Sequence, residues 1–176
     1  MISQNLKDRA AKVKLVILDV DGVLTDGRIV LGCFGDELKF FDIQDGHGMV
    51  MLHRAGFKTV LITGRKSRIN LKRAKEMKVG KVYQNAHDKL KIFEKTLKKF
   101  HVSAEEICCV GDDLIDLPVL RRAGFSVAVK NAVEEVRQAA HYVTEREGGR
   151  GAVREITDLL LKAQGLWTEA TERYFR

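Results

Sequence analysis

The sequence has few features of a membrane, secreted or disulfide-rich protein. Its longest apolar stretches, such as residues 15–18, are far too short to span a bilayer. The N-terminus has no basic segment followed by a long apolar one, so no secretory signal is expected. The three cysteines are an odd number and lack a Cys-x-x-Cys pair, and the neighbours Cys108 and Cys109 lie in a strand-like apolar pattern. We therefore expect a cytoplasmic protein without a disulfide framework, a cysteine-bound metal or a membrane partner.

Internal repeats, low-complexity linkers and a second domain are also missing from the sequence. A chain of 176 residues suits one domain, which we place at residues 1–176. The net charge of +7 indicates either an anionic partner or simply a lysine-rich surface. Because the basic residues are dispersed and form no platform with aromatic residues, we expect a small phosphorylated metabolite rather than a nucleic acid.

Short apolar runs alternate along the chain with patterns typical of helices. Apolar runs without interruption indicate strands buried on both faces, and strands that alternate with helices indicate a parallel sheet. The predicted fold is therefore α/β, with a Rossmann-like parallel sheet and helices on both faces. In such a sheet ligands bind at the carboxyl ends of the strands. The predicted strands are 15–18, 59–62, 82–83, 107–110, 126–129 and 142–143, and the predicted helices are 48–55, 67–77, 88–100, 114–123, 133–140 and 152–164.

Residues 28–42 interrupt this alternation directly after the first strand. Two short strand patterns, 28–31 and 38–42, surround a turn at 32–36 and predict a projecting β-hairpin. The hairpin is rich in large apolar side chains, namely Ile29, Leu31, Phe34, Phe40 and Phe41. A projecting hairpin of this composition would be partly exposed in a monomer, which favours an interface between subunits. The alternative is that the hairpin folds back onto its own domain.

The first acidic motif stands at the end of the first predicted strand. Asp19 and Asp21 follow the apolar run 15–18, and Gly22 comes next. An Asp-Gly turn would explain Asp21 and Gly22, but it gives no reason for Asp19. The strand places Asp19 at the edge of the sheet where ligands bind.

The second acidic motif follows the strand predicted at 107–110. Asp112, Asp113 and Asp116 bring three carboxylates within five residues, where they repel one another, so a bound cation is a natural explanation. The N-terminus of a helix also favours acidic residues. That alternative does not account for all three so close to two further acids.

Two other segments carry groups suited to phosphate. Thr63, Gly64 and Arg65 end the strand predicted at 59–62, and a hydroxyl with free backbone N–H groups at such an edge suits a phosphate. The segment lacks the Gly-Lys-Ser/Thr sequence of a Walker loop. Lys89 lies just inside a predicted helix, where a single lysine is usually a solvated surface residue.

The order of these motifs is more specific than any one of them. Asp-x-Asp-Gly, then Thr, then Lys, then Gly-Asp-Asp-x-x-Asp, all between Asp19 and Asp116, resembles the haloacid dehalogenase superfamily of phosphatases. Response-regulator receiver domains use similar groups in a different order. The chain is too short for the cap domain of many superfamily members. Segments 21–27, 63–66, 111–116 and 148–155 further resemble the 3-deoxy-D-manno-octulosonate 8-phosphate phosphatase family, over about residues 14–165.

This resemblance implies Mg²⁺-dependent hydrolysis of a sugar-acid phosphate through an aspartyl phosphate, in the synthesis of lipopolysaccharide precursors. It implies that Asp19 is the nucleophile. Asp21 would be the general acid and then the general base. Thr63 and Lys89 would hold the phosphoryl oxygens. Magnesium would take the carboxylates of Asp19 and Asp112 and the main-chain carbonyl of Asp21.

The resemblance also implies roles around this centre. Asp113 and Asp116 would lie behind it and orient Lys89 or metal-bound waters. Thr63, Gly64, Lys89 and the two arginines Arg65 and Arg73 would bind the substrate, the arginines meeting its second charge. For both arginines an ordinary surface position is the alternative. Arg150 could take part only if its loop lies near the site.

The resembled family assembles as homotetramers, which we expect here through the hairpin at 28–42. The tail at 166–176 would then be either a frayed terminus or a lid over a neighbouring subunit's site. Two alternatives stay open for the function. The substrate could be a nine-carbon acid sugar phosphate or another small phosphate ester, and the chain could be a regulatory subunit that has lost turnover.

Overall fold

The computed structural model describes residues 3–176, and at its centre lies a six-stranded parallel sheet. The strand order is β5-β4-β1-β6-β7-β8. This arrangement confirms the predicted Rossmann-like α/β fold, with strand bounds within one or two residues of those expected. The strands are β1 (Leu15–Leu18), β4 (Lys58–Ile62), β5 (Lys81–Tyr83), β6 (Ile107–Gly111), β7 (Phe125–Ala128) and β8 (Tyr142–Val143).

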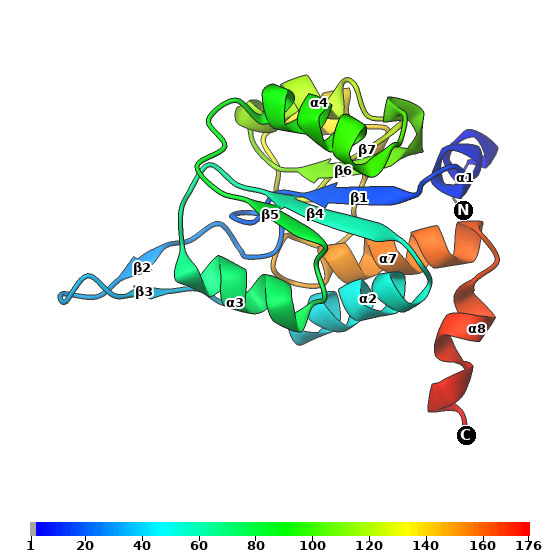
Figure 1. Cartoon of the computed structure of the whole chain (residues 1–176), viewed down its shortest axis with the longest axis horizontal. Helices are drawn as coiled ribbons and strands as arrows, with labels where there is room; N and C mark the ends of the chain where they lie inside the picture. Colours follow the sequence, from blue (N-terminus) through cyan, green and yellow to red (C-terminus); the bar gives the residue numbers. More distant parts are fainter. Residues whose placement is uncertain (1–2) are drawn as a thin grey trace.

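Helices cover both faces of the sheet, with α4 on one face and α2, α3 and α7 on the other (Figure 1). The helices of this layer structure are α2 (Ile43–Arg54), α3 (Arg68–Glu76), α4 (Lys89–Phe100), α5 (Leu117–Leu120), α6 (Glu134–Ala139) and α7 (Ala152–Ala163). Single 3₁₀ turns η1 (Ala104–Glu106) and η2 (Leu114–Asp116) precede β6 and α5. The predicted helix at 114–123 is therefore shorter and begins with a 3₁₀ turn.

Two further helices, α1 and α2, differ from the sequence expectation for identifiable reasons. Helix α1 (Gln4–Ala11) was not expected, because only Ala10 is buried in it and its apolar periodicity is weak. Helix α2 begins at residue 43 rather than 48, because Asp42 caps it by accepting from the backbone N–H groups of Gln44 and Asp45. Two glycines in its first two turns, Gly46 and Gly48, made that start look like a loop.

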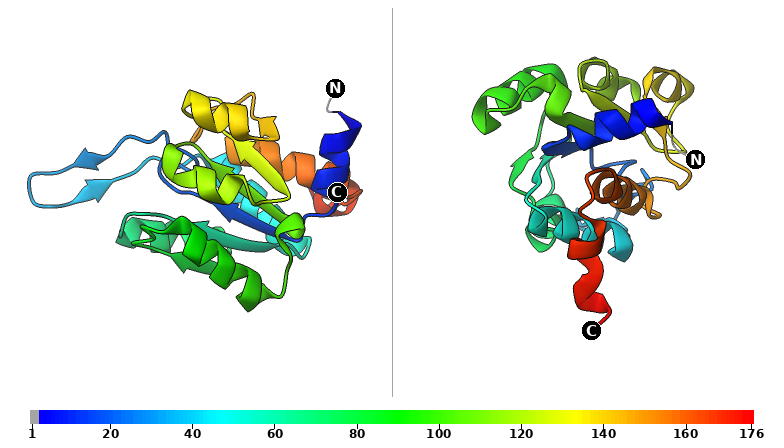
Figure 2. Two further views of the ribbon diagram at one scale, coloured as in Figure 1. Left: turned by 90° about the horizontal axis from the view of Figure 1, so that it is seen from above. Right: turned by 90° about the vertical axis from the view of Figure 1, so that its right-hand side faces the viewer.

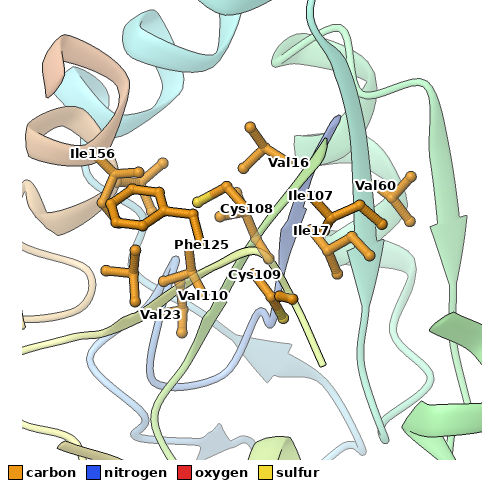
Figure 3. Packing of buried hydrophobic residues seen from close by; sticks show 14 of the residues in the cluster. Val16, Ile17, Val23, Val60, Ile107, Cys108, Cys109, Val110, Phe125 and Ile156 are labelled. Atoms are coloured by element: carbon orange, nitrogen blue, oxygen red, sulfur yellow. The ribbon is translucent and has the colours of Figure 1, made fainter. Parts of the chain in front are cut away.

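The core lies on both sides of the central strands β1, β4 and β6. Every residue of β1 is buried, and Val16 and Ile17 pair in register with Cys108 and Cys109 of β6. The two cysteine side chains point away from each other in the packed core, with Phe125 of β7 nearby (Figure 3). The packed core therefore fixes where β1, β4 and β6 end relative to one another.

The hairpin projects from the domain beyond the carboxyl ends of the strands (Figures 1 and 2). Its strands are shorter than expected, β2 (Val30–Leu31) and β3 (Glu37–Leu38). Phe34 is 96% exposed and Leu31 is 71% exposed, whereas Phe41 packs against the core. The hairpin as a whole does not fold back onto its own chain, and the predicted projection is confirmed.

The tail forms α8 (Trp167–Thr171) and the 3₁₀ turn η3 (Glu172–Tyr174) at the opposite end of the molecule from the hairpin (Figure 1). The Tyr174 hydroxyl lies 2.8 Å from His47 Nε2 and accepts from Arg54 Nη1 at 2.9 Å, so the tail is held by α2 of its own chain. The tail therefore does not cover the strand ends of its own subunit. Within residues 3–176, none of the helices has the length and apolar character needed to cross a membrane.

Candidate active site

The sheet brings three of the predicted site residues to neighbouring strand ends. Leu18 of β1 pairs in register with Leu61 of β4 and with Val110 of β6. Asp19, Thr63 and Asp112 follow these strands within one or two residues. Asp19 and Thr63 are buried and Asp112 is half-buried. The parallel register therefore gathers groups that are far apart in the sequence.

Lys89 joins this group from the first turn of α4. Its ammonium Nζ lies 3.0 Å from Asp19 Oδ1 and 2.6 Å from Asp116 Oδ1, and the residue is 5% exposed. Burial alone would lower the pKa of Lys89, but the two carboxylates outweigh it and raise that pKa above its ordinary value. Lys89 is thus a buried cation held beside the predicted nucleophile, and not the solvated surface lysine of the alternative interpretation.

Asp116 and Asp113 differ in what they contact. The Asp116 carboxylate accepts three hydrogen bonds. Oδ1 accepts from Lys89, and Oδ2 accepts from the backbone N–H groups of Asp112 at 3.1 Å and Asp113 at 3.4 Å. The exposed Asp113 side chain accepts from the backbone N–H of Leu114 at 2.7 Å and so caps η2. Asp116, rather than Asp113, is the residue that holds Lys89 in place.

The carboxylates at the strand ends have too few cationic or hydrogen-bond-donating partners within the described chain. Asp19, Asp112 and Asp116 each offer an oxygen within 4.8 Å of the others. Asp112 Oδ1 and Asp21 Oδ2 are buried and have no hydrogen-bond partner among residues 3–176. Burial, followed by the neighbouring carboxylates, raises the pKa of Asp112 to about 7. Burial raises the pKa of Asp19 to about 7 as well, with Lys89 opposing the shift and Asp116 adding to it.

These observations fit a hard divalent cation. Such an ion prefers several oxygen ligands, and it would supply the missing charge and the missing partner for Asp112 Oδ1. Both oxygens of Asp116 are already engaged by protein donors, so Asp19 and Asp112 are the carboxylates left for the ion. The full ligand set, with the main-chain carbonyl of Asp21, stays a prediction.

Gly22 makes the close approach of the two acidic motifs possible. Its backbone has φ +97°, and a Cβ at this position would overlap the Asp112 carboxylate. A side chain here would push Asp112 away from the turn that carries Asp21. The glycine of the first motif is thus required by the position of an acid in the second.

The segment after β4 lies at the strand ends, where the sequence predicts a phosphate site. The Thr63 hydroxyl accepts from the backbone N–H of Arg65 at 3.2 Å. Apart from its two chain neighbours, nothing in residues 3–176 lies within 4 Å of where a Cβ on Gly64 would be. The Arg65 side chain is 48% exposed, and its Nη2 lies 3.5 Å from Glu37 Oε1 of the hairpin. Arg65 therefore stands at the rim between the strand ends and the hairpin.

Arg73 is engaged with the protein. Its Nη2 donates to the carbonyl oxygen of Asp42 at 2.7 Å, Nη1 lies 3.3 Å from Glu76 Oε2, and its guanidinium stacks over the Phe41 ring. A Cβ on Gly46 would overlap the same guanidinium. Arg73 thus anchors the return of the hairpin into α2, and its contact with substrate stays a prediction.

Sequence reasoning missed Lys39, which reaches the site from the hairpin. Its side chain is fully buried, its ammonium contacts Asp21 Oδ1, and it lies 3.8 Å from Glu37 Oε1. The available signal was the spacing of Glu37 and Lys39, because residues two apart in a strand share one face. An apolar hairpin with two charges on one face indicates a polar contact at its base.

The glycine-rich loop at 148–151 lies beside the first motif. The backbone N–H of Gly149 donates to the Val23 carbonyl at 3.0 Å, and a Cβ on Gly148 would overlap the Gly22 carbonyl. Arg150 on this loop is 62% exposed, and its Nη2 lies 4.0 Å from Asp26 Oδ2. Arg150 is thus near the turn after β1, but its partner is not one of the clustered carboxylates.

Comparison with known proteins places this site in a family. A model described as haloacid dehalogenase-like hydrolase matches residues 67–156. The 3-deoxy-D-manno-octulosonate 8-phosphate phosphatase of Salmonella typhi is 43% identical over 169 residues, which cover 96% of this chain and 90% of that protein. A crystal structure of the same phosphatase from Moraxella catarrhalis, in complex with a magnesium ion, a phosphate ion and KDO, is 38% identical with a TM-score of 0.94, covering 99% of this chain and 100% of that one.

A cobalt-bound form of the Haemophilus influenzae phosphatase is 33% identical with a TM-score of 0.89, over 98% of this chain and 100% of that one. The matches to these three relatives span nearly the whole chain and agree with the order and geometry of the site. The chain therefore belongs to the haloacid dehalogenase-like hydrolases and, within them, to the family of the 3-deoxy-D-manno-octulosonate 8-phosphate phosphatases.

Proposed function

We propose that this chain is a Mg²⁺-dependent phosphatase that hydrolyses 3-deoxy-D-manno-octulosonate 8-phosphate in the cytoplasm, in the synthesis of lipopolysaccharide precursors. The observation that carries the proposal is the buried Asp19 at the end of β1, held 3.0 Å from Lys89 and beside the incompletely paired carboxylate of Asp112. The relative from Moraxella catarrhalis, which binds magnesium, phosphate and KDO, supports the choice of substrate.

In the first step Asp19 attacks phosphorus and the bond from phosphorus to the sugar oxygen breaks, which leaves an aspartyl phosphate on Asp19. Asp21 gives a proton to the departing sugar oxygen. In the second step Asp21 takes a proton from water, the water attacks phosphorus, and Asp19 is released with inorganic phosphate. Both roles suit Asp21, because its Oδ2 is buried and unpaired among the described residues.

Lys89 and Thr63 hold the phosphoryl oxygens during both steps. Lys89 is already fixed by Asp116, so its charge needs little reorganisation when a phosphate arrives. Magnesium would be held by the carboxylates of Asp19 and Asp112 and the main-chain carbonyl of Asp21, and when bound it supplies charge that offsets repulsion between these acids and the phosphate. Asp113 keeps the start of η2 in shape behind this centre.

The substrate's second charge, its carboxylate, would be met at the rim of the site. Arg65 is the better placed arginine, because half of its side chain is exposed beside Gly64, where the backbone is open. Arg73 would either donate a hydrogen bond to the substrate or hold the turn at Asp42 in position. A site that pairs a charged group discriminates strongly against substrates that lack it.

The closure of this capless site would come from assembly. The exposed apolar hairpin supports a homotetramer, with residues 28–42 at the interface. The tail lies far from the site of its own chain, so residues 166–176 could act as a lid only on a neighbouring subunit. Light scattering at micromolar concentration should give a tetrameric mass, and a monomeric mass would contradict the proposed assembly.

Deletion of 166–176 should change kcat or KM while the mass stays the same. Wild-type kinetics after the deletion would contradict the role of the tail as a lid.

A panel of phosphate esters with Mg²⁺ tests the proposed function. The eight-carbon sugar-acid phosphate should exceed glucose 6-phosphate by about 100-fold or more in kcat/KM, because only the former has a carboxylate to pair. A higher kcat/KM with a nine-carbon acid sugar phosphate would overturn the substrate assignment but leave the proposed phosphatase chemistry intact. Failure to hydrolyse any ester, 4-nitrophenyl phosphate included, would favour a regulatory subunit.

A further inference from the structure

The hairpin has a polar base as well as an apolar tip. Lys39 follows β3 directly, and its side chain is fully buried (0% exposed), although the hairpin around it is largely open to solvent. A buried ammonium needs anionic partners, and among residues 3–176 those within 4.0 Å are Asp21 Oδ1 and Glu37 Oε1. The position of this lysine is therefore set by the site and not by the solvent.

The two oxygens of Asp21 have different surroundings. Oδ1 contacts the Lys39 ammonium, whereas Oδ2 is buried and without a hydrogen-bond partner within residues 3–176. A contact on one oxygen restricts rotation of the carboxyl group about its last bond. The other oxygen is thereby left free, in a fixed place, for proton exchange.

Glu37 extends this contact to the rim of the site. It lies 3.8 Å from the Lys39 ammonium and 3.5 Å from the Arg65 guanidinium. Together these residues form a row of alternating charges from Asp21 to Arg65, and the two middle members come from the hairpin. The hairpin thus contacts both the residue that exchanges protons and the residue at the substrate rim.

We propose that Lys39 is a positioning residue for the reaction: by holding Asp21 Oδ1, it directs Asp21 Oδ2 to the oxygen of the leaving sugar. This inference rests on the proposed function, because it presumes that Asp21 protonates the leaving group. It gives the hairpin a part in the chemistry that is separate from any part in assembly.

Two esters with different leaving groups isolate this role. An alkyl phosphate such as 3-deoxy-D-manno-octulosonate 8-phosphate needs a proton on its departing oxygen, whereas the nitrophenolate of 4-nitrophenyl phosphate leaves without one. Lys39→Met should lower kcat/KM for the sugar phosphate by about 10- to 100-fold, part of the 10²–10⁴-fold that a general acid contributes. The loss for 4-nitrophenyl phosphate should stay below about threefold, because kcat/KM covers only the steps up to leaving-group departure. Lys39→Arg, which keeps a cationic donor, should restore part of the difference.

Arg28→Gln is the matched control, because Arg28 is a cation at the same end of the hairpin whose partner is Asp26. It should leave the ratio of the two kcat/KM values unchanged. Light scattering on each variant separates a change of assembly from a change of chemistry. If Lys39→Met does not fold, Lys39→Ser, which admits water in place of the side chain, carries the same comparison.

A double-mutant cycle with Asp21→Asn tests whether Lys39 acts through Asp21. For the sugar phosphate, Lys39→Met should have almost no further effect in the Asp21→Asn background. An undiminished effect there would show that Lys39 acts on the substrate directly and would overturn the inference. Equal losses for both esters, or no loss for either, would overturn it as well. Wild-type protein that hydrolyses neither ester would instead contradict the proposed function.

Discussion

Asp112 and Asp45 are two aspartates withdrawn from water in different parts of the molecule. Burial is the largest cause of the raised pKa in both, to about 7 for Asp112 and about 6 for Asp45. Asp45 Oδ1 accepts from the backbone N–H of Arg154 at 2.7 Å, and Oδ2 accepts from that of Gly151 at 3.3 Å. Asp112 Oδ1 has no such partner in the described chain.

The difference lies in what satisfies each carboxylate. Asp45 lies at the N-terminus of α7 and accepts hydrogen bonds from backbone N–H groups that the helix leaves free. Its carboxylate is therefore satisfied without a ligand. Asp112 is withdrawn from water with an oxygen that the protein leaves unpaired, close to the carboxylates of Asp19 and Asp116. A raised pKa alone therefore does not separate a structural acid from a ligand-binding one, whereas the hydrogen-bond inventory does.

Substitution of Asp112 should give the largest functional effect. Asp112→Asn should lower kcat/KM for the sugar phosphate by about 100-fold or more, because a neutral amide is a poor ligand for a hard cation. Asp45→Asn should leave the Mg²⁺ concentration for half-maximal activity unchanged. Steady-state kinetics over a Mg²⁺ titration compares the two. Full activity of Asp112→Asn in excess chelator would remove Asp112 from the metal site.

Substitution of Asp45 should instead affect stability. Asp45→Ala leaves the N–H groups of Gly151 and Arg154 unpaired, each at a cost of roughly 1–3 kcal/mol, so the free energy of unfolding should fall by about 2–6 kcal/mol. Asp45→Asn, which keeps one acceptor, should lose less. Urea unfolding of the three proteins measures the difference. An alanine variant as stable as wild type would show that solvent replaces the carboxylate at the start of α7.

Magnesium should stabilise the folded protein only where its site is intact. At 100 times the dissociation constant a ligand adds about 2.7 kcal/mol, so Tm should rise by roughly 5–10 °C for wild type and Asp45→Asn. Asp112→Asn should show little rise. At pH 8 without metal it should be at least as stable as wild type, since it lacks the buried charge. A full Mg²⁺ shift in Asp112→Asn would contradict the assigned ligand.

The pH dependence of stability should reveal Asp45. Its pKa is raised from 3.8 to about 6 in the folded state, so the folded protein binds the proton more tightly than the unfolded chain does. This contribution is present at low pH and is lost as the pH rises from about 4 through 6. The stability of Asp45→Asn relative to wild type should therefore increase by about 2 kcal/mol between pH 4 and 7. Denaturant unfolding at both pH values measures it, and a difference that does not change with pH would mean that the carboxyl titrates normally.

Much of the fold and the centre of the site could be predicted, because both depend on local sequence. Uninterrupted apolar runs located β1, β4 and β6, and the register of a parallel sheet then placed Asp19, Thr63 and Asp112 together. The parts that could not be predicted depend on contacts between distant segments. Lys39 approaches Asp21 only because the hairpin leaves the sheet at a particular angle. Arg73 turned to the backbone of Asp42 because Gly46 leaves room for it.

Helix boundaries were less predictable where apolar spacing was weak. The start of α2 was hidden by Gly46 and Gly48, although Asp42 is a good capping residue. In α1, Ala10 is the one fully buried residue, so the sequence shows no apolar stripe. The helix is tied to the domain by hydrogen bonds from Arg9 to the carbonyl oxygen of Gly124 at 2.7 Å and from Gln164 to the carbonyl oxygen of Ala10 at 3.1 Å.

The central claim is that Asp19 carries the phosphoryl group during turnover. Borohydride reduces an acyl phosphate to an alcohol, so protein quenched during hydrolysis of the sugar phosphate and then reduced should contain homoserine at position 19. Peptide mass spectrometry locates the change, and Asp19→Asn, which should have no turnover, is the control. We expect homoserine at 19 only in the presence of both Mg²⁺ and substrate. Reduction at Asp21 or Asp112 instead, or rapid turnover by Asp19→Asn, would contradict the account.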